Sequence, residues 1–370
     1  MSNDTQIQPP IRYSDDLETL QPNEAENIQT ILQMMAKSQM EIAEKHRHAH
    51  RDAHAKSHAI LKGTMTVHEN LPVELAQGIF QSGNHYEVVA RLSSALGDIQ
   101  SDDTPTPRGF AVKVMDVAGD RLLDTIEGNN QDFLMVNVPT IAFGDVEKYL
   151  KLLKATGGSI AANETFQKVT SAAANAVKKT VEAVGGTTPS AIDLMAGNRH
   201  HMLGETFHTQ AAIRYGDYVA KLSLHPQSSN VRELTGHDIK GDGFSAMRDA
   251  VGEFFANNDA TYTLCVQLMR DVDKMPIEDA SVLWDEELSP MLPIATFHFE
   301  AQQPYTNARQ VYGDDVLSFN PWNGVAAHRP LGSIMRVRKD AYERSTQFRH
   351  ERNQCERREP NTHGDIPDRS

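Results

Sequence analysis

The chain has 370 residues, of which 39% are hydrophobic and 23% charged, and its formal net charge is -14. A chain of this length can bury a large core, so we expect one large domain with appended helices. The acidic balance argues against nucleic acid or an anionic membrane surface as a partner, because binding a phosphate backbone requires a basic surface.

Neither a membrane span nor an export signal is expected. The N-terminus lacks a basic region followed by an apolar run, and no stretch is apolar over the ~20 residues that a bilayer requires. Of the two cysteines, Cys265 lies in a strand-like run and Cys355 in a charged tail, so a structural disulfide is not expected. These features favour an intracellular protein of the reducing cytoplasm.

Residues 1–45 are expected to form an N-terminal arm and a helix. Residues 1–22 are polar and contain two adjacent prolines, which is typical of an extended segment. Residues 23–46 have helical spacing of apolar side chains, which Gln39 interrupts. The apolar side of this helix, expected to pack on the rest of the protein, consists of Ile28, Ile31, Leu32, Met35 and Ile42.

Residues 46–350 predict one α+β domain. Residues 145–185 and the chain from about 332 onward have helical character, and residues 351–370 are a charged tail that is expected to be disordered. Two groups of strands with helices between them suit a closed antiparallel barrel, because closure leaves no exposed sheet edge. The expected strands are 86–92, 110–117, 133–138, 208–224, 261–269 and 293–301.

A tyrosine near the C-terminus has two arginines at helical spacing. If residues 338–349 are helical, Arg338, Tyr342 and Arg349 fall on nearly one face, so both guanidinium groups can point where the phenol points. A phenol with a pKa of about 10 is a poor metal ligand at neutral pH unless cations stabilise its anion. The pattern predicts an anionic tyrosine beside a metal, although the same spacing also describes ordinary packing and surface charge.

Histidines recur every four residues at His46, His50, His54 and His58. On a continuous helix they would form one histidine face that could bind zinc or nickel. The same stretch is also compatible with a solvated surface or with a catalytic role for His54. The pattern leaves the three interpretations open.

Several short blocks follow one another in an order that resembles haem catalases. Several motifs in one order are far more specific than any one of them, and these span roughly residues 45 to 350. The blocks are RDAHAK at 51–56, ARLS at 90–93, PRGFAVK at 107–113, GNN at 128–130, HMLG at 201–204, HT at 208–209, VQLM at 266–269, FNP at 319–321 and RKDAY at 338–342.

The resemblance implies a catalase-like closed antiparallel β-barrel with inserted and flanking helices. Because the chain is shorter than typical catalases, the C-terminal helical domain of that family is expected to be lacking or reduced. The implied cofactor is haem b, with Tyr342 as the axial ligand of the iron and Arg338 keeping the tyrosine ionised; tyrosine is the general axial ligand in catalases. A homo-oligomer, either a dimer or a tetramer, is also implied.

The resemblance also assigns residues to the side of the haem opposite Tyr342. There His54 would take a proton from one peroxide oxygen and return it to the other, which is general acid–base catalysis. Ser93 would hold the imidazole, and Asn129 would orient the peroxide through its amide.

Other residues would hold the haem itself. Guanidinium groups suit carboxylates because they can form bidentate pairs. The expected partners of the haem propionates are Arg51, Arg91 and Arg349, and Phe143 is expected to be a further pocket residue.

Two departures from the family pattern bear on the substrate. Ala95 stands where the family has a valine that narrows the substrate channel, and Leu134 and Met135 stand where the family has two aromatic residues near the pocket. A wider, less aromatic pocket is therefore expected. The chain would then be a catalase-like peroxidase or weak catalase, or alternatively an enzyme that converts organic or fatty-acid hydroperoxides. A third alternative is a non-catalytic haem-binding or sensor protein.

Overall fold

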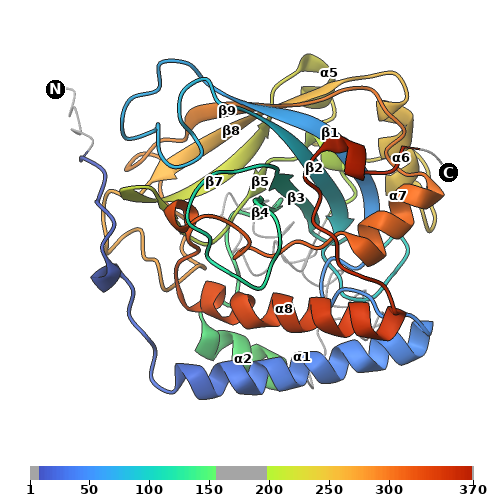
Figure 1. The fold of residues 1–370 in the computed structure, drawn as a ribbon, viewed down its shortest axis with the longest axis horizontal. Helices are drawn as coiled ribbons and strands as arrows, with labels where there is room; N and C mark the ends of the chain where they lie inside the picture. The colour runs from blue at the N-terminus through green and yellow to red at the C-terminus, as the bar shows by residue number, and fades with distance from the viewer. Residues whose placement is uncertain (1–7, 156–197, 369–370) are drawn as a thin grey trace, which may run out of the picture.

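The structure is a computed structural model that describes residues 8–155 and 198–368. Its body is an antiparallel β-barrel (Figure 1). The sheet order is β5-β4-β3-β2-β1-β9-β8-β7, and pairing of β5 with β7 closes the barrel, while β6 extends from β7. The strands are β1 (Ser57–Val67), β2 (His85–Ser94), β3 (Arg108–Val114), β4 (Gln131–Val136), β5 (Phe207–His208), β6 (Ile213–Tyr215), β7 (Tyr218–Pro226), β8 (Ala260–Leu268) and β9 (Leu292–Phe299).

Side chains of β2, β3 and β4 alternate between the barrel core and its outer face, as the two-residue period of a strand requires. Their inward side chains, such as Leu92 and Phe110, belong to the main hydrophobic core. The hydrogen-bonded register sets the outward ones in rows across the three strands. Two of these rows are Ser93–Gly109–Val136 and Arg91–Ala111–Leu134.

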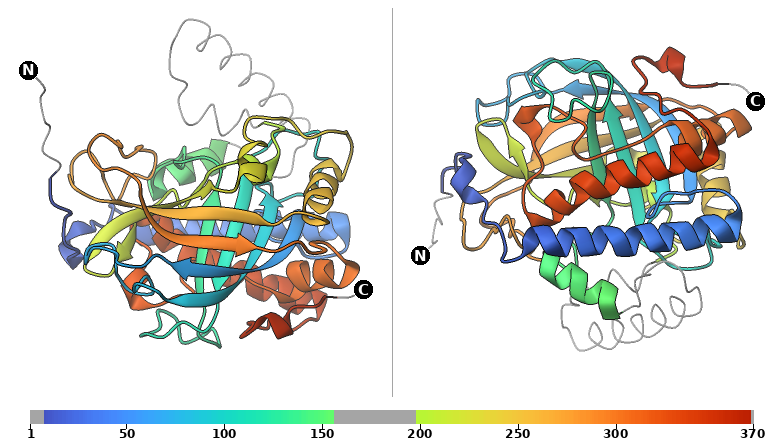
Figure 2. Two further views of the ribbon diagram at one scale, coloured as in Figure 1. Left: turned by 90° about the horizontal axis from the view of Figure 1, so that it is seen from above. Right: turned by 60° about the horizontal axis from the view of Figure 1, so that its bottom comes forward.

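Three helices form a layer along one side of the barrel (Figures 1 and 2). They are α1 (Glu24–His46), α2 (Val146–Ala155) and α8 (Ser333–Asn353). A shared apolar cluster holds the layer together, with Ile31 from α1, Leu150 from α2 and Val337 from α8 among its members. Gln39, which interrupts the apolar side of α1, is buried. Its polar side chain is tolerated there because its amide donates to the carbonyl oxygens of His50 and Ser345.

Shorter helical elements lie in the connections between these strands and helices or toward the chain ends. Within the described residues, no helix is long and apolar enough to span a membrane. These elements are η1 (Asp15–Leu17), η2 (Met202–Gly204), α5 (Ser229–Arg232), α6 (Ala246–Phe255), α7 (Asn307–Val311), the π-helical turn η3 (Tyr312–Val316), η4 (Ala326–His328) and η5 (His363–Asp365).

The structure differs from the sequence-based expectations in the strand count and at the chain's end. β1 was not expected, because its alternation is hidden among lysine, glycine and threonine residues. The predicted helix at 145–185 is described only as α2, and its remainder lies outside the described residues.

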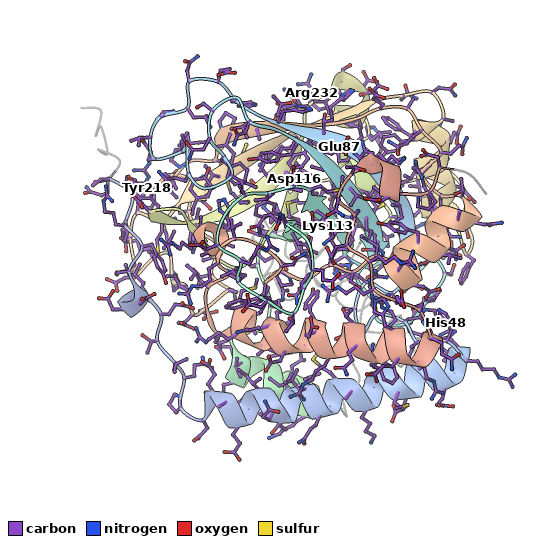
Figure 3. All side chains as sticks on the ribbon, viewed as in Figure 1. His48, Glu87, Lys113, Asp116, Tyr218 and Arg232 are labelled. Carbon is purple, nitrogen blue, oxygen red and sulfur yellow. The ribbon has the colours of Figure 1, made fainter. Side chains whose placement is uncertain are left out.

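The C-terminal tail packs on the barrel as far as residue 368, so the prediction of a disordered 351–370 segment is wrong for that part. Glu359 reaches the fully buried Lys113, whose ammonium lies 2.7 Å from both Glu359 and Asp132. Figure 3 shows Lys113 in the interior of the molecule. Near its end the tail is also held by Arg309, which donates to Asp368 at 2.9 Å. The tail is thus tied to the barrel by a buried ion pair, and removing either partner of such a pair is strongly destabilising.

Candidate functional site

A pocket lies between the outer face of the barrel and the helical layer. Its barrel wall comes from residues 51–54 and from β2, β3 and β4, and its helical wall comes chiefly from α8. Phe143 and Tyr149, whose rings stack at 4.4 Å, also line it. The pocket brings together all but one of the site residues expected from the sequence.

His54 stands on the barrel wall in a constrained backbone. Its φ of 55° is unusual for a residue with a side chain, and its amide N–H donates to the Ala95 carbonyl at 3.1 Å. Arg91 donates to the His54 carbonyl at 2.9 Å. The Nδ1 atom lies 3.1 Å from the Ser93 hydroxyl, and the ring rests on Gly109, where a side chain would collide with it. The imidazole is therefore held by contacts on several sides.

The environment of His54 favours its neutral form. Burial is the main cause, and nearby guanidinium groups the second, of a pKa lowered from 6.5 to about 3. A neutral imidazole can accept a proton at physiological pH, which is the state that a general base needs. Because Nδ1 is engaged with Ser93, the Nε2 atom is the nitrogen left for the pocket.

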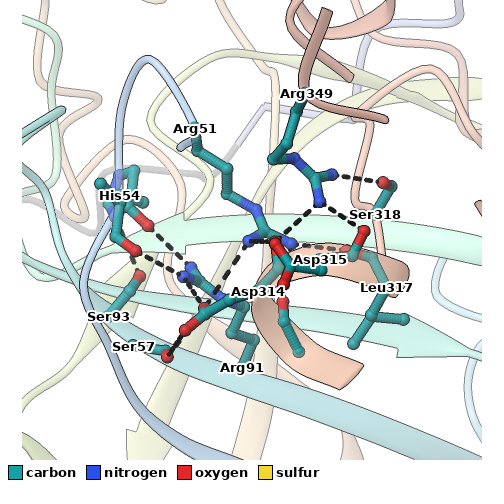
Figure 4. A network of polar contacts seen from close by, with 12 residues as sticks. Arg51, His54, Ser57, Arg91, Ser93, Asp314, Asp315, Leu317, Ser318 and Arg349 are labelled. Carbon is teal, nitrogen blue, oxygen red and sulfur yellow. Dashed lines mark hydrogen bonds and ion pairs between the residues drawn. The ribbon is translucent and has the colours of Figure 1, made fainter. Parts of the chain in front are cut away.

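Three arginines gather at one end of the pocket (Figure 4). Arg91 pairs with the Asp314 carboxylate at 3.0 Å, while Arg51 and Arg349 both donate to the Asp314 carbonyl, at 3.1 and 2.7 Å. Burial, followed by repulsion from Arg91, lowers the pKa of Arg349 to about 10. Burial and the two other guanidinium groups likewise lower the pKa of Arg51. This end of the pocket would therefore be stabilised by an anionic ligand.

Tyr342 and Arg338 line the pocket from α8, one helical turn apart. Arg338 acts to lower the pKa of Tyr342, but burial is the larger cause, and the net pKa is raised above 10. Arg338 therefore does not by itself outweigh the effect of burial on Tyr342 in the protein without a bound cation. The phenol would ionise only with further positive charge, such as that of a bound metal.

Asp52 and Tyr149 are among the polar residues of the pocket that were not expected from the sequence. Asp52 accepts a hydrogen bond from the Ser345 hydroxyl at 3.0 Å, and burial raises its pKa. Burial, with the charge of Asp52 second, likewise raises the pKa of Tyr149. Asp52 belongs to the RDAHAK block and Tyr149 to no block, and their proximity depends on how α2 and α8 pack against the loop that follows α1.

Asn129 is the one expected site residue that the structure does not bring to the pocket. It is exposed, lies in the loop before β4, and its carbonyl accepts from the Val117 N–H at 2.6 Å. The long connection between β3 and β4 places this loop beyond the wall. Leu134 and Val136 instead line the pocket from β4. Ala95 is also absent from the lining, so the argument for a wider channel from this residue has no support here.

The histidine run does not form one face, because it is not one helix. α1 ends at His46, His50 and His54 lie in the following loop, and His58 is fully buried in β1. Over residues 8–155 and 198–368, no group of three or more His, Cys, Asp or Glu side chains is placed to hold a metal ion. The zinc or nickel interpretation depended on a continuous helix and loses its basis.

The fold and this pocket define a catalase-like barrel protein. The family model for catalases matches residues 11–352, and the chain belongs to the catalase family. No curated protein matches the chain in sequence.

Solved catalases share the fold. A fungal catalase, a bacterial catalase and catalase A from Saccharomyces cerevisiae superpose with TM-scores of 0.57, 0.57 and 0.56, each at 16% identity. Each alignment covers 84% of this chain but 61%, 59% and 63% of the respective catalase. The chain thus spans less than two thirds of the length of these catalases.

The donor set of the pocket fits the haem group that the family implies. The Nε atoms of Arg91 and Arg349 are buried without a hydrogen-bond partner. Arg51, Arg91 and Arg349 carry three positive charges beside the carboxylates of Asp314 and Asp315, so an excess positive charge faces this end of the pocket. A propionate carboxylate would neutralise it, since buried guanidinium groups pair well with carboxylates.

Proposed function

We propose that this protein is a haem-dependent enzyme that converts peroxides, acting as a catalase-like peroxidase or weak catalase. One observation carries the proposal. A single pocket holds a neutral histidine, His54, bonded to Ser93 on its barrel wall, and a tyrosine, Tyr342, on its helical wall, with arginines at one end. Membership of the catalase family supports it.

Haem b is the proposed cofactor. Tyr342 would ligate the iron from α8, and Arg51, Arg91 and Arg349 would bind the propionates at the charged end of the pocket. When bound, the haem iron supplies the redox chemistry by which a peroxide O–O bond is cleaved. The positive charge of a bound iron would also oppose the effect of burial, which raises the pKa of Tyr342.

The protein's own part in the reaction is proton transfer and positioning. His54 accepts a proton at Nε2 from one peroxide oxygen and delivers it to the departing oxygen, so no charge builds up in the buried site. For Nε2 to accept, Nδ1 carries the hydrogen and donates it to the Ser93 hydroxyl. Arg91 fixes the backbone of His54 through its carbonyl, which keeps the ring in place.

The test of this proposal is haem binding by the Tyr342→Phe variant. Wild-type protein titrated with haem should give a high-spin ferric absorption spectrum at one haem per chain, whereas Tyr342→Phe should lose that spectrum and bind haem weakly. Tyr218→Phe, the same substitution at a residue far from the pocket, should match wild type. An unchanged spectrum and affinity in Tyr342→Phe would refute the tyrosine ligand.

A second variant distinguishes an enzyme from a non-catalytic haem-binding or sensor protein. His54→Ala should retain the haem and lose peroxide turnover, because the acid–base group is removed while the haem contacts remain. Haem-loaded wild-type protein without turnover of any peroxide would favour the non-catalytic haem-binding role. We also expect a homo-oligomer, which light scattering coupled to size-exclusion chromatography tests.

A further inference from the structure

The wall beside His54 is apolar. The imidazole rests on Gly109, and the register places Val136 in the same row across the sheet. In the next row Ala111 stands opposite Leu134. Within the described part of the chain, the residues that β3 and β4 contribute to the pocket are glycine or apolar throughout.

Neither asparagine that flanks β4 supplies an amide to this wall. Asn129 is exposed in the loop before the strand. Asn137, just after it, is engaged outside the pocket: its Oδ1 accepts from the Arg108 N–H at 2.8 Å and its Nδ2 donates to Glu205 at 3.2 Å. The strand itself places Leu134 and Val136 at the pocket.

The residues that α8 contributes to the pocket extend from Ile334 to Arg349, with Arg338 one turn from Ile334. Arg349 lies with the other two arginines, and Ile334 lies fifteen residues earlier on the same helix. At a rise of 1.5 Å per residue the two positions are about 22 Å apart. Ile334 belongs to an apolar cluster against which Phe143 packs. This cluster therefore offers apolar surface to a bound ligand.

We infer that the peroxide substrate of this site carries an organic group, so that it is an alkyl or aryl hydroperoxide in preference to hydrogen peroxide. This inference rests on the proposed function. Hydrogen peroxide has two O–H groups. His54 can accept a hydrogen bond from one of them, and the other would face the apolar side chains of Leu134 and Val136. An unpaired buried hydroxyl weakens binding roughly 5- to 150-fold.

An organic hydroperoxide fits the same wall without that loss. It has a single O–H group for His54, and its carbon substituent can contact Leu134 and Val136 in place of the second hydroxyl. Burying such a group removes apolar surface from water, which favours binding. Leu134 is only half-buried because it borders the pocket, so a side chain at this position faces the ligand.

The first test compares two substrates on haem-loaded protein. Wild type should have kcat/KM for cumene hydroperoxide at least about 10-fold above that for hydrogen peroxide. Leu134→Asn should lower this ratio at least about 10-fold, because the amide offers a partner to the second O–H group. Leu283→Asn, the same change at a residue that is 62% exposed, should leave the ratio unchanged. Should Leu134→Asn fold poorly, Val136→Thr adds a hydroxyl to the same wall in nearly the same volume and should shift the ratio the same way.

The second test measures binding without turnover. Calorimetric titration of haem-loaded protein with 2-phenyl-2-propanol, the alcohol that corresponds to cumene hydroperoxide, should detect binding that Leu134→Asn weakens at least about 5-fold. A wild-type preference for hydrogen peroxide, or a ratio that neither variant changes, would overturn the inference while leaving haem-dependent peroxide conversion intact. Failure to bind haem at all would instead overturn the proposed function.

Discussion

Gly109→Ala should displace the imidazole on which the proposed chemistry depends. A Cβ at this position would lie 2.5 Å from Nδ1 and 2.6 Å from Cε1 of His54, and 2.9 Å from the Ser93 hydroxyl, whereas ordinary contact begins at 3.4 Å. The ring must therefore retreat by about 1 Å. A misplacement of that size lowers catalysis about 100-fold, or about 2.7 kcal/mol in the activation free energy. Gly109 does not have a positive φ, so alanine itself fits the strand backbone.

The assay is kcat/KM for peroxide on haem-loaded protein, with haem content read from the absorption spectrum and folding from a thermal melt. Gly252→Ala is the matched control, because this glycine lies in α6 with no atom within 4 Å of an added Cβ, and it should keep wild-type turnover. In a His54→Ala background, Gly109→Ala should have little further effect, since the group it displaces is gone. Full turnover by Gly109→Ala with full haem content would refute the role of the His54 ring position.

Three further predictions follow from the site and the tail. Asn129→Ala should leave kcat/KM within about twofold of wild type, because the residue lies outside the pocket; a tenfold loss would return its amide to the reaction. Burial lowers the pKa of His54 from 6.5 to about 3, so its neutral form persists as the pH falls through 6.5. The pH profile of kcat/KM should therefore decline only toward pH 3 and have no inflection near 6.5. An inflection at pH 6–7 would contradict the buried environment of His54. Glu359→Gln should reduce the free energy of unfolding in urea by about 1.5–3 kcal/mol, because it removes one of the two carboxylates on buried Lys113; unchanged stability would show that the tail does not hold the barrel in this way.

The sequence was most informative where a motif is local. The Arg338–Tyr342 pair lies within one turn of helix, and the segment from Arg51 to His54 lies within a short loop. These site residues could therefore be recognised from the sequence without knowledge of the fold. Tyr342 and His54 do line one pocket, and Arg51 does as well. The strand pattern also predicted a barrel, which the structure contains.

The sequence misled where a motif depends on what precedes and follows it. The GNN block predicted a side-chain amide in the site. The loop after β3 is long, however, and β4 begins only at Gln131, so Leu134 and not Asn129 pairs with Ala111. In a strand, a shift of one residue moves a side chain to the other face, and residue spacing alone does not set that register. The prediction of a metal-binding histidine face lost its basis for a related reason. It assumed one continuous helix, whereas the four histidines lie in a helix end, a loop and a strand.

By itself, the sequence determined which chemical groups this protein carries and the order in which the chain presents them. The tertiary structure alone decided which of these groups meet. Burial gives His54 a pKa of about 3, and cross-strand register places Leu134 beside it. Packing of α2 and α8 against the loop that follows α1 brings Tyr149 and Asp52 to the same pocket. Desolvation and register depend on segments far apart in the chain, and no local pattern of residues encodes them.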